Sequence, residues 1–216
     1  ISAMAIAMQT LLHTMVTPPN VSRETFLLYA DYVALLLKWN AKINLIGPTT
    51  EADIWSRHIE DSAQLVPLIP ASAKNLIDLG SGGGLPGLVI AIARPDLAVT
   101  LVEQDQRKAA FLREASIRLK LTRVTVLDAD IATVTGQYDV VTARALTTLD
   151  RLLSMAAPLL AEGAIGLFPK GENHATELAA ARQNWCFESQ QKPSATHGGA
   201  SIITISQLTP SRTENR

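Results

Sequence analysis

Residues 75–87 have the composition of a loop that binds a nucleotide-like ligand. The apolar segment Leu76–Leu79 contains one acid, Asp78, and leads directly into closely spaced glycines at positions 80, 82, 83, 84 and 87. Glycine adopts positive φ angles at little cost and lets a ligand lie against the backbone. Pro86 suits the first turn of a helix, where its missing N–H is not needed. A strand, a glycine loop and a helix N-terminus in this order indicate a nucleotide-type site in an α/β sheet.

Two templates compete for this loop. Gly82, Gly84 and Gly87 match the Gly-x-Gly-x-x-Gly pattern of dinucleotide-binding proteins, but two residues separate that pattern from the strand. Counted from the strand end, Asp78, Gly80, Gly82 and Gly84 form an acid, a spacer and alternate glycines, which is typical of methyltransferases that use S-adenosylmethionine (SAM). SAM has no pyrophosphate, and an acid at the loop entrance suits the ammonium group of its methionine end. The loop therefore favours SAM over NAD(P).

Three polar residues follow the next strands of the pattern. Glu103 ends a strand about twenty residues after the glycines, where a carboxylate can accept both ribose hydroxyls of an adenosine. Asp130 follows the third strand and can accept from an adenine amino group or cap a helix. Arg144 follows the fourth strand, and ligands of open α/β sheets lie beyond the carboxyl ends of the strands. Arg144 can hold a carboxylate, a phosphate or a base edge, or it is a surface arginine.

Strand and helix patterns alternate after residue 75 and predict a mostly parallel sheet with helices on both faces. The expected strands are 75–79, 98–103, 124–127, 139–142, 164–168, 185–190 and 201–208, and the expected helices between them are 86–94, 105–121, 150–160 and 173–182. No helix separates the last two strands, which predicts an antiparallel hairpin at one sheet edge. Helices at 22–40 and 51–68 make residues 1–70 a helical extension of a compact ligand-binding domain at 71–216.

Composition limits the function classes. The 216 residues are 47% hydrophobic and 18% charged, as in a globular protein, and no apolar run has the length of a membrane span. The single cysteine, Cys186, excludes a disulfide framework, and the four histidines lack metal-ligand spacing. Residues 1–16 are apolar without a basic leader, so no signal peptide is expected. We expect a cytoplasmic monomer that needs no metal.

Five sequence blocks then resemble one family. In order they are Arg57–Ser62 (RHIEDS), Asp78–Gly87 (DLGSGGGLPG), Arg107–Arg113 (RKAAFLR), Thr142–Ala145 (TARA) and Pro169–Gly171 (PKG). Together they resemble the RsmG (GidB) family of bacterial 16S ribosomal RNA guanine-N7 methyltransferases, over roughly residues 25 to 190. The RHIEDS block and the Leu-Pro-Gly ending carry most of the specificity.

The resemblance implies a class I SAM-dependent methyltransferase fold, Rossmann-like, whose last strands form an antiparallel hairpin. It also implies that SAM is the cofactor and that 16S ribosomal RNA or a small-subunit particle is the partner. The resemblance implies SAM contacts for Gly80, Leu85, Asp130, Ile131 and Arg144. With the residues taken from the loop and the strand ends, the expected cofactor set is Asp78, Gly80, Gly82, Gly84, Leu85, Glu103, Asp130, Ile131 and Arg144.

Guanine N7 carries a free lone pair at neutral pH, so methyl transfer to it needs alignment with the SAM methyl group and no proton acceptor. No residue has a certain catalytic role, and the candidates are Arg144, Arg57 and His58. RNA has to be held by phosphate contacts and by shape. The basic residues expected to contribute are Arg57, Arg107, Lys108, Arg113, Arg118 and Lys170, although those on the 105–121 helix also fit an ordinary solvated face.

Two alternatives remain open. One is an NAD(P)-dependent oxidoreductase, which lacks a clear hydride-relay residue here. The other is a non-catalytic RNA-binding protein on a methyltransferase fold, against which the intact glycine loop and Glu103 argue. The net charge of −1 suggests a preassembled RNA–protein surface as substrate. The chain departs from the family at Gly198–Ser201, where the charged Gly-x-Arg-type turn is absent, which puts a substrate contact from this turn in question.

Overall fold

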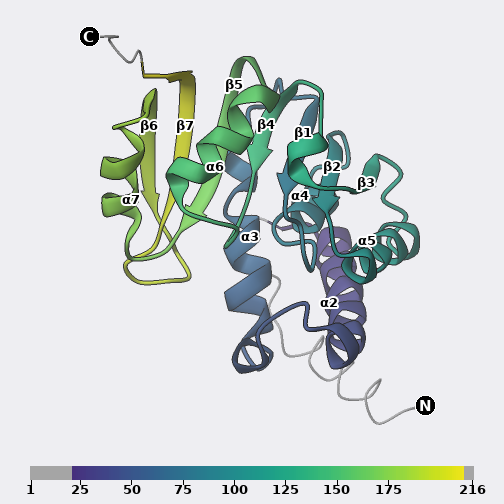
Figure 1. Cartoon of the computed structure of the whole chain (residues 1–216). Coiled ribbons are helices and arrows are strands. Elements are labelled where there is room, and N and C mark those ends of the chain that lie inside the picture. Colours follow the sequence, from purple (N-terminus) through teal and green to yellow (C-terminus); the bar gives the residue numbers. More distant parts are fainter. Residues whose placement is uncertain (1–20, 212–216) are drawn as a thin grey trace, which may run out of the picture.

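The computed structural model describes residues 21–211, so the expectation made for residues 1–16 lies outside the described part of the chain. One seven-stranded sheet organises the molecule, in the order β3-β2-β1-β4-β5-β7-β6 (Figure 1). The strands are β1 (Asn75–Leu79), β2 (Ala98–Glu103), β3 (Val124–Asp128), β4 (Tyr138–Thr142), β5 (Leu160–Lys170), β6 (Trp185–Pro193) and β7 (Ser201–Pro210). The first five strands run parallel, and β7 and β6 add antiparallel at one edge. The expected fold class and the C-terminal hairpin are both confirmed.

Helices cover both faces of this sheet. The longer helices are α2 (Arg23–Ile43), α4 (Gly87–Ala93), α5 (Gln106–Arg118), α6 (Leu149–Ala156) and α7 (His174–Ala181). In Figure 1, α2, α4 and α5 lie on one side of the sheet, while α6 and α7 lie on the other. Neighbouring residues of β1 alternate between the two cores, because Leu76 packs with α2 and α4 while Ile77 packs with α6 and α7. Helices thus cover both faces of the sheet, and the ends of the strands remain open.

The prediction of one regular helix over residues 51–68 is wrong. That region instead holds a π-helical segment, η2 (Trp55–Glu60), one turn of α-helix, α3 (Asp61–Ala63), and a short 3₁₀ turn, η3 (Val66–Leu68). The other short turns are η1 (Pro48–Thr50), η4 (Ile131–Thr133) and η5 (Ala157–Leu159). A π-helical turn is wider than an α-turn and occurs often at functional sites. The hydrophobic spacing fitted a regular helix and carried no sign of the wider turn.

Two further helices end earlier than expected. The helix predicted to reach residue 160 ends at Ala156, because Pro158 has no N–H to continue the ladder, and β5 already begins at Leu160. The helix predicted to reach residue 121 ends at Arg118, since Lys120 takes a left-handed backbone conformation with φ of 55°. In the range 21–211 no helix combines the length and apolarity needed to cross a bilayer.

Candidate functional site

The glycine loop between β1 and α4 needs the backbone freedom of glycine. Gly80, Gly82 and Gly84 have φ angles of 66°, 53° and 84°, a region that residues with a Cβ rarely adopt. Ser81 Oγ donates to the carbonyl of Asp78 at 3.0 Å, and Gly84 N donates to the carbonyl of Ser81 at 2.7 Å. The loop therefore folds tightly across the carboxyl end of β1 and presents its backbone outward.

Asp78 is fully buried beneath this loop. Its Oδ1 accepts from Thr142 Oγ1 at 2.9 Å, and its Oδ2 accepts from Gly87 N at 3.3 Å. Burial raises the pKa of this carboxyl group to about 6. The side chain thus ties β1 to β4 and to the start of α4.

The N-terminal helix α2 supports the same loop from the other side. The buried hydroxyl of Tyr32 donates to the carbonyl of Gly83, and Tyr29 Oη donates to the carbonyl of Val89 in α4 at 3.2 Å. A Cβ at Gly83 would meet Leu36 Cδ1 at 3.3 Å, so α2 packs closely on the loop. Residues 21–70 therefore help to build the site. Their separation as a helical extension stays a prediction.

A cavity of about 500 Å³ opens beyond the carboxyl ends of β1 to β4, and we call it the glycine-loop cavity. Its wall includes six of the nine expected cofactor residues, namely Gly80, Gly82, Glu103, Asp130, Ile131 and Arg144. The other three are absent from this wall and are buried, Asp78 at the end of β1 and Gly84 and Leu85 in the loop. The volume is in the range of small-molecule sites.

Glu103 is held rigidly at this cavity. Its Oε2 accepts from Gly82 N at 2.8 Å and its Oε1 accepts from Asp105 N at 2.9 Å, with 8% of the residue exposed. A carboxylate oxygen can accept two hydrogen bonds, so both oxygens retain an acceptor position for hydroxyls. Asp130 caps η4 by accepting from Ala132 N at 2.9 Å, which is the capping role, and it also lines the cavity.

The charged groups at this cavity fit SAM. Glu103 and Asp130 supply acceptors from β2 and β3, while Arg144 supplies a cation from the end of β4, on the opposite side of β1. An adenosine offers hydroxyl and amino donors, whereas the methionine end offers a carboxylate that suits a cation. A Cβ on Gly80 would approach Leu146 Cδ1 to 2.7 Å, so only a glycine fits this wall as it stands.

A second cavity of about 380 Å³, here called the polar cavity, shares Arg144, Ala145 and Thr147 with the first. Its remaining polar lining comes from separate parts of the chain: Thr50, Arg57, His58, Asp61, Lys170, Glu177 and His197. The two cavities therefore meet at the Arg144–Thr147 segment, so a group in one can reach a ligand in the other there.

Arg144 is the most constrained side chain of this junction. Its Nη1 donates to Asp61 Oδ2 and to the carbonyl of Arg57, both at 3.3 Å, and its Nη2 lies 3.2 Å from His58 Nδ1. Because a guanidinium only donates, His58 Nδ1 accepts and the ring proton lies on Nε2, 2.8 Å from Thr50 Oγ1. Burial lowers the pKa of His58 to about 4, so the ring is neutral at pH 7. His58 positions Arg144.

The turn between β6 and β7 is fastened to the same cluster. Thr196 Oγ1 donates to Asp61 Oδ1 at 2.8 Å, and Ala195 N donates to Gln64 Oε1 at 3.0 Å. His197 then lines the polar cavity. The turn that lacks the family's arginine at Gly198–Ser201 therefore brings a histidine to this cavity, a contribution that the sequence reasoning missed.

Most of the basic residues expected at RNA have local acidic partners. Arg107 pairs with Asp105, Arg113 with Asp128 and Arg118 with Glu114, at 3.5, 3.5 and 2.8 Å, and the three arginines are exposed on α5. Lys108 lines the glycine-loop cavity, and Arg57 is exposed at the polar cavity. Lys170 has only 9% of its side chain exposed and pairs with Glu177 at 2.8 Å.

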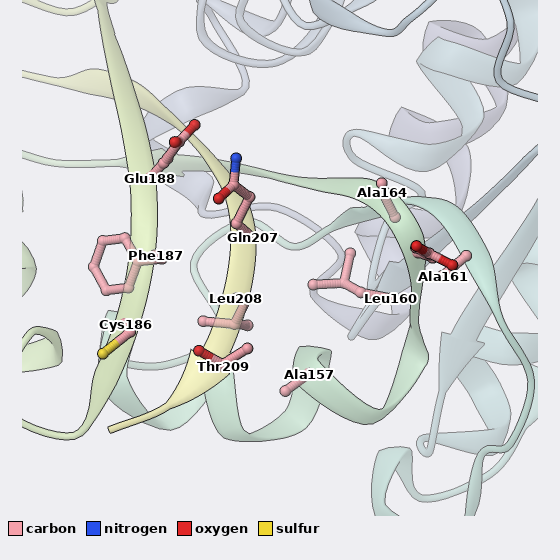
Figure 2. A pocket seen from close by; sticks show the side chains of 12 residues that line it. Ala157, Leu160, Ala161, Ala164, Cys186, Phe187, Glu188, Gln207, Leu208 and Thr209 are labelled. Atoms are coloured by element: carbon pink, nitrogen blue, oxygen red, sulfur yellow. The ribbon is translucent and has the colours of Figure 1, made fainter. Parts of the chain in front are cut away.

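A further cavity lies away from these two. Figure 2 shows it between the start of β5 and the β6–β7 hairpin, with Leu160, Phe187 and Leu208 among the side chains that line it. Its volume is about 600 Å³, and its only charged lining residues are Glu162 and Glu188. It lies at the amino end of β5, away from the glycine loop, and it contains none of the expected site residues. In the described part of the chain, no three His, Cys, Asp or Glu residues cluster as a metal site requires.

Comparison with known proteins gives consistent matches. A family model described as "GidB: rRNA small subunit methyltransferase G" matches residues 27–205. "Ribosomal RNA small subunit methyltransferase G" of Acidiphilium cryptum is 49% identical over 191 residues, covering 87% of this chain and 88% of that protein. The protein of the same name from Paramagnetospirillum magneticum is 48% identical over 202 residues, covering 93% and 97%.

Solved structures share the fold at low identity. An O-methyltransferase from Bacillus cereus, in complex with SAH, aligns with a TM-score of 0.58 at 14% identity and covers 94% of this chain and 97% of that one. A ribosomal protein L11 methylase from Lactobacillus delbrueckii aligns with a TM-score of 0.55 at 16% identity, covering 67% and 76%.

Proposed function

The chain belongs to the rRNA small subunit methyltransferase G family, and from this premise we propose that it methylates N7 of a guanine in 16S ribosomal RNA. Family membership makes it a SAM-dependent rRNA methyltransferase and favours that activity over an oxidoreductase or a non-catalytic binding protein. The observation that supports the finer proposal is the pair of cavities that meet at the Arg144–Thr147 segment.

The glycine-loop cavity is proposed to bind SAM, which supplies an activated methyl group on a sulfonium. Glu103 accepts the ribose hydroxyls, the backbone of Gly80 and Gly82 lies against the ligand, and Asp130 with Ile131 borders the adenine. Arg144 holds the carboxylate end. Asp78, Gly84 and Leu85 act by shaping the loop rather than by direct contact.

The polar cavity is proposed to receive the guanine. N7 attacks with its own lone pair, so the protein has to orient the base and exclude water, and alignment of the reacting atoms supplies much of the acceleration. His58 fits this picture because it is neutral at pH 7 and both ring nitrogens already have partners. Arg144 lines both cavities, and we assign it the role of positioning both ligands.

RNA contacts are proposed for Arg57 at the rim of the polar cavity and for the exposed arginines of α5. The acidic partners on α5 reduce the attraction of this helix for phosphate. A near-neutral protein with paired arginines suits a substrate whose shape is already formed, so we propose the small-subunit particle rather than free RNA as substrate.

The test combines SAM binding with methyl transfer. Calorimetry should show heat with SAM and none with NAD. Labelled SAM, the purified protein and small-subunit particles from cells that lack the enzyme should give 7-methylguanosine in 16S RNA, identified by nuclease digestion and mass spectrometry. Methylation at another guanine atom, or on another base, would contradict the N7 proposal. Equal rates with particles and with protein-free RNA would contradict the particle as substrate.

A further inference from the structure

Lys170 and Glu177 form a half-buried ion pair that has no role in the reaction proposed above. Lys170 ends β5, and its ammonium group donates to Glu177 Oε2 at 2.8 Å and to the carbonyl of Thr147 at 2.6 Å. Glu177 lies in the first turn of α7, and the same Oε2 also accepts from Leu149 N at 2.7 Å. Both residues line the polar cavity. The pair thus joins β5, α7 and the segment that both cavities share.

Each member of this pair has hydrogen-bonding capacity left. An ammonium group carries three hydrogens, and within the described residues two of those of Lys170 have partners. Both contacts of Glu177 within the described residues use Oε2, so Oε1 has an open acceptor position in that range. Side-chain exposure is 9% for Lys170 and 25% for Glu177. Burying an ion pair is costly, and replacing it with apolar residues is often neutral for stability. A pair that is retained in a cavity with spare capacity therefore calls for a ligand.

We propose that Lys170 and Glu177 read the Watson–Crick edge of the target guanine, an inference that rests on the proposed function. Guanine presents an acceptor, O6, beside a donor, N1–H, with the N2 amino donor next to it. A donor beside an acceptor is the complement of this edge: Lys170 donates to O6, and Glu177 Oε1 accepts from N1–H. Adenine presents the opposite order, a donor at N6 and an acceptor at N1, and it would place like groups against each other.

This orientation also directs N7 correctly. O6 lies between the Watson–Crick edge and N7, so a base held at O6 and N1 by the pair can direct N7 toward the shared Arg144–Thr147 segment and the glycine-loop cavity. Methylation at N7 makes the base cationic, which makes N1–H a stronger donor. The carboxylate of Glu177 therefore binds the transition state more strongly than the ground state, which raises kcat rather than lowering KM.

The test replaces the target guanine in reconstituted small-subunit particles by 2-aminopurine, which keeps N7 and the 2-amino group but lacks O6 and the N1 proton. Single-turnover rates are measured for both particles with an excess of the full-length enzyme. The wild-type enzyme should prefer guanine by about 100-fold or more, since a site built around polar groups rejects an analogue that leaves them unpaired.

Glu177→Gln gives the sharpest outcome. The amide oxygen has to stay at the Oε2 position, because Leu149 N and Lys170 both donate there, so the amide NH₂ replaces Oε1. A donor then faces N1, which suits 2-aminopurine and opposes guanine. The preference for guanine should fall by about 10-fold or more, with the loss in kcat. Lys170→Met should reduce the rate on guanine while leaving that on 2-aminopurine nearly unchanged, and Lys170→Arg should restore most of the preference.

Glu188→Gln on β6 is the matched control, because Glu188 is exposed and lies outside both cavities. SAM affinity and melting temperature establish that each variant is folded. Equal losses on both substrates in Glu177→Gln and Lys170→Met would assign the pair a purely structural role and overturn the inference alone. An absence of N7 methylation by the wild-type enzyme would instead contradict the proposed function, and this inference with it.

Discussion

The glycine-loop cavity and the polar cavity are built in different ways. The first combines backbone groups of the loop after β1, held in glycine conformations, with side chains that follow β2, β3 and β4. The second takes its polar groups from η1, η2, α3, the end of β5, α7 and the β6–β7 turn, and nearly all of them are side chains. Only the Arg144–Thr147 segment belongs to both.

This difference determines how each cavity responds to change. A backbone wall fails when a Cβ enters it, because the positive φ angle is strained for residues other than glycine and the added atoms take the space of the ligand. A side-chain wall made of many small contributions loses one hydrogen bond at a time, and the rest remain in place. Substitutions of the loop glycines in the first cavity should therefore abolish cofactor binding, whereas those in the second cavity should lower turnover by graded amounts.

The largest expected effect is that of Gly80→Asp on SAM binding. Gly80 has φ of 66°, and a Cβ there would lie 2.7 Å from Leu146 Cδ1 in the cavity wall. SAM affinity measured by calorimetry should fall by about 100-fold or more, because the carboxylate and the displaced leucine both enter the cavity. Gly163→Asp is the matched control: its φ is 75°, but nothing lies within 4 Å of its added Cβ. Both variants should lose about 1–2 kcal/mol of stability, and only the first should lose SAM. Equal SAM affinity in Gly80→Asp and wild type would show that the ligand does not lie on this loop.

A smaller effect is expected for Asp61→Asn, which alters the anchor of Arg144. Asp61 Oδ2 accepts from Arg144 at 3.3 Å, and its Oδ1 accepts from Thr196 at 2.8 Å. The asparagine keeps one acceptor and turns a donor toward the guanidinium, so Arg144 loses its fixed position. We expect kcat/KM on the particle to drop about 10-fold while SAM affinity changes by less than about 3-fold.

Glu60→Gln is the control for that variant, since Glu60 is exposed and immediately precedes Asp61. It should leave the rate unchanged to within about 2-fold. A loss of SAM affinity as large as the loss of turnover in Asp61→Asn would show that the two cavities respond as one unit, against the distinction drawn above.

The same contrast explains what could be predicted from the sequence. The strand, the loop and Glu103 follow from local patterns, because glycine spacing and strand ends are read within a few dozen residues. Arg144, Asp61 and Thr196 come together only through the packing of α3 against the end of β4 and against the β6–β7 turn. Glu177 gave no more signal than any acid in a first helical turn. Asp78 carried a clear motif signal, yet its burial, which turns the carboxylate inward to Thr142 and Gly87, depends on the neighbouring strand and helix.

A modest effect is expected when the tyrosines of α2 are substituted. The two variants distinguish a side chain that supports the glycine loop from one that supports only the fold. Tyr32→Phe removes the hydroxyl that donates to Gly83, and Tyr29→Phe removes the one that donates to Val89. Each should cost about 1 kcal/mol in chemical denaturation. Only Tyr32→Phe should weaken SAM binding, by about 2- to 5-fold, because Gly83 belongs to the loop. Identical SAM affinities in the two variants would mean that the loop keeps its conformation without α2.

The dependence of stability on pH compares the two cavities through one ionisable group from the surroundings of each. Burial raises the pKa of Asp78 to about 6, so between pH 4 and 6 this carboxyl group binds more protons in the folded protein than in the unfolded chain. The contribution of Asp78 to stability therefore falls as pH rises through that window. Burial lowers the pKa of His58 to about 4, so its contribution has the opposite sign: stability is lost as pH falls from 6.5 toward 4. In the wild-type protein these two slopes oppose each other.

Asp78→Asn should unmask the slope of His58. The amide oxygen can still accept from Gly87 N, and its NH₂ can donate to Thr142 Oγ1, so the hydrogen bonds at this site are kept. The free energy of unfolding of the variant, relative to wild type, should increase between pH 4 and 6 and stay constant above, by at most about 2–3 kcal/mol. His58→Gln should have the reverse effect on the slope. Parallel stability curves for Asp78→Asn and wild type would show that Asp78 ionises as readily in the folded protein as in the unfolded chain, and that the interior beneath the glycine loop is more polar than its burial implies.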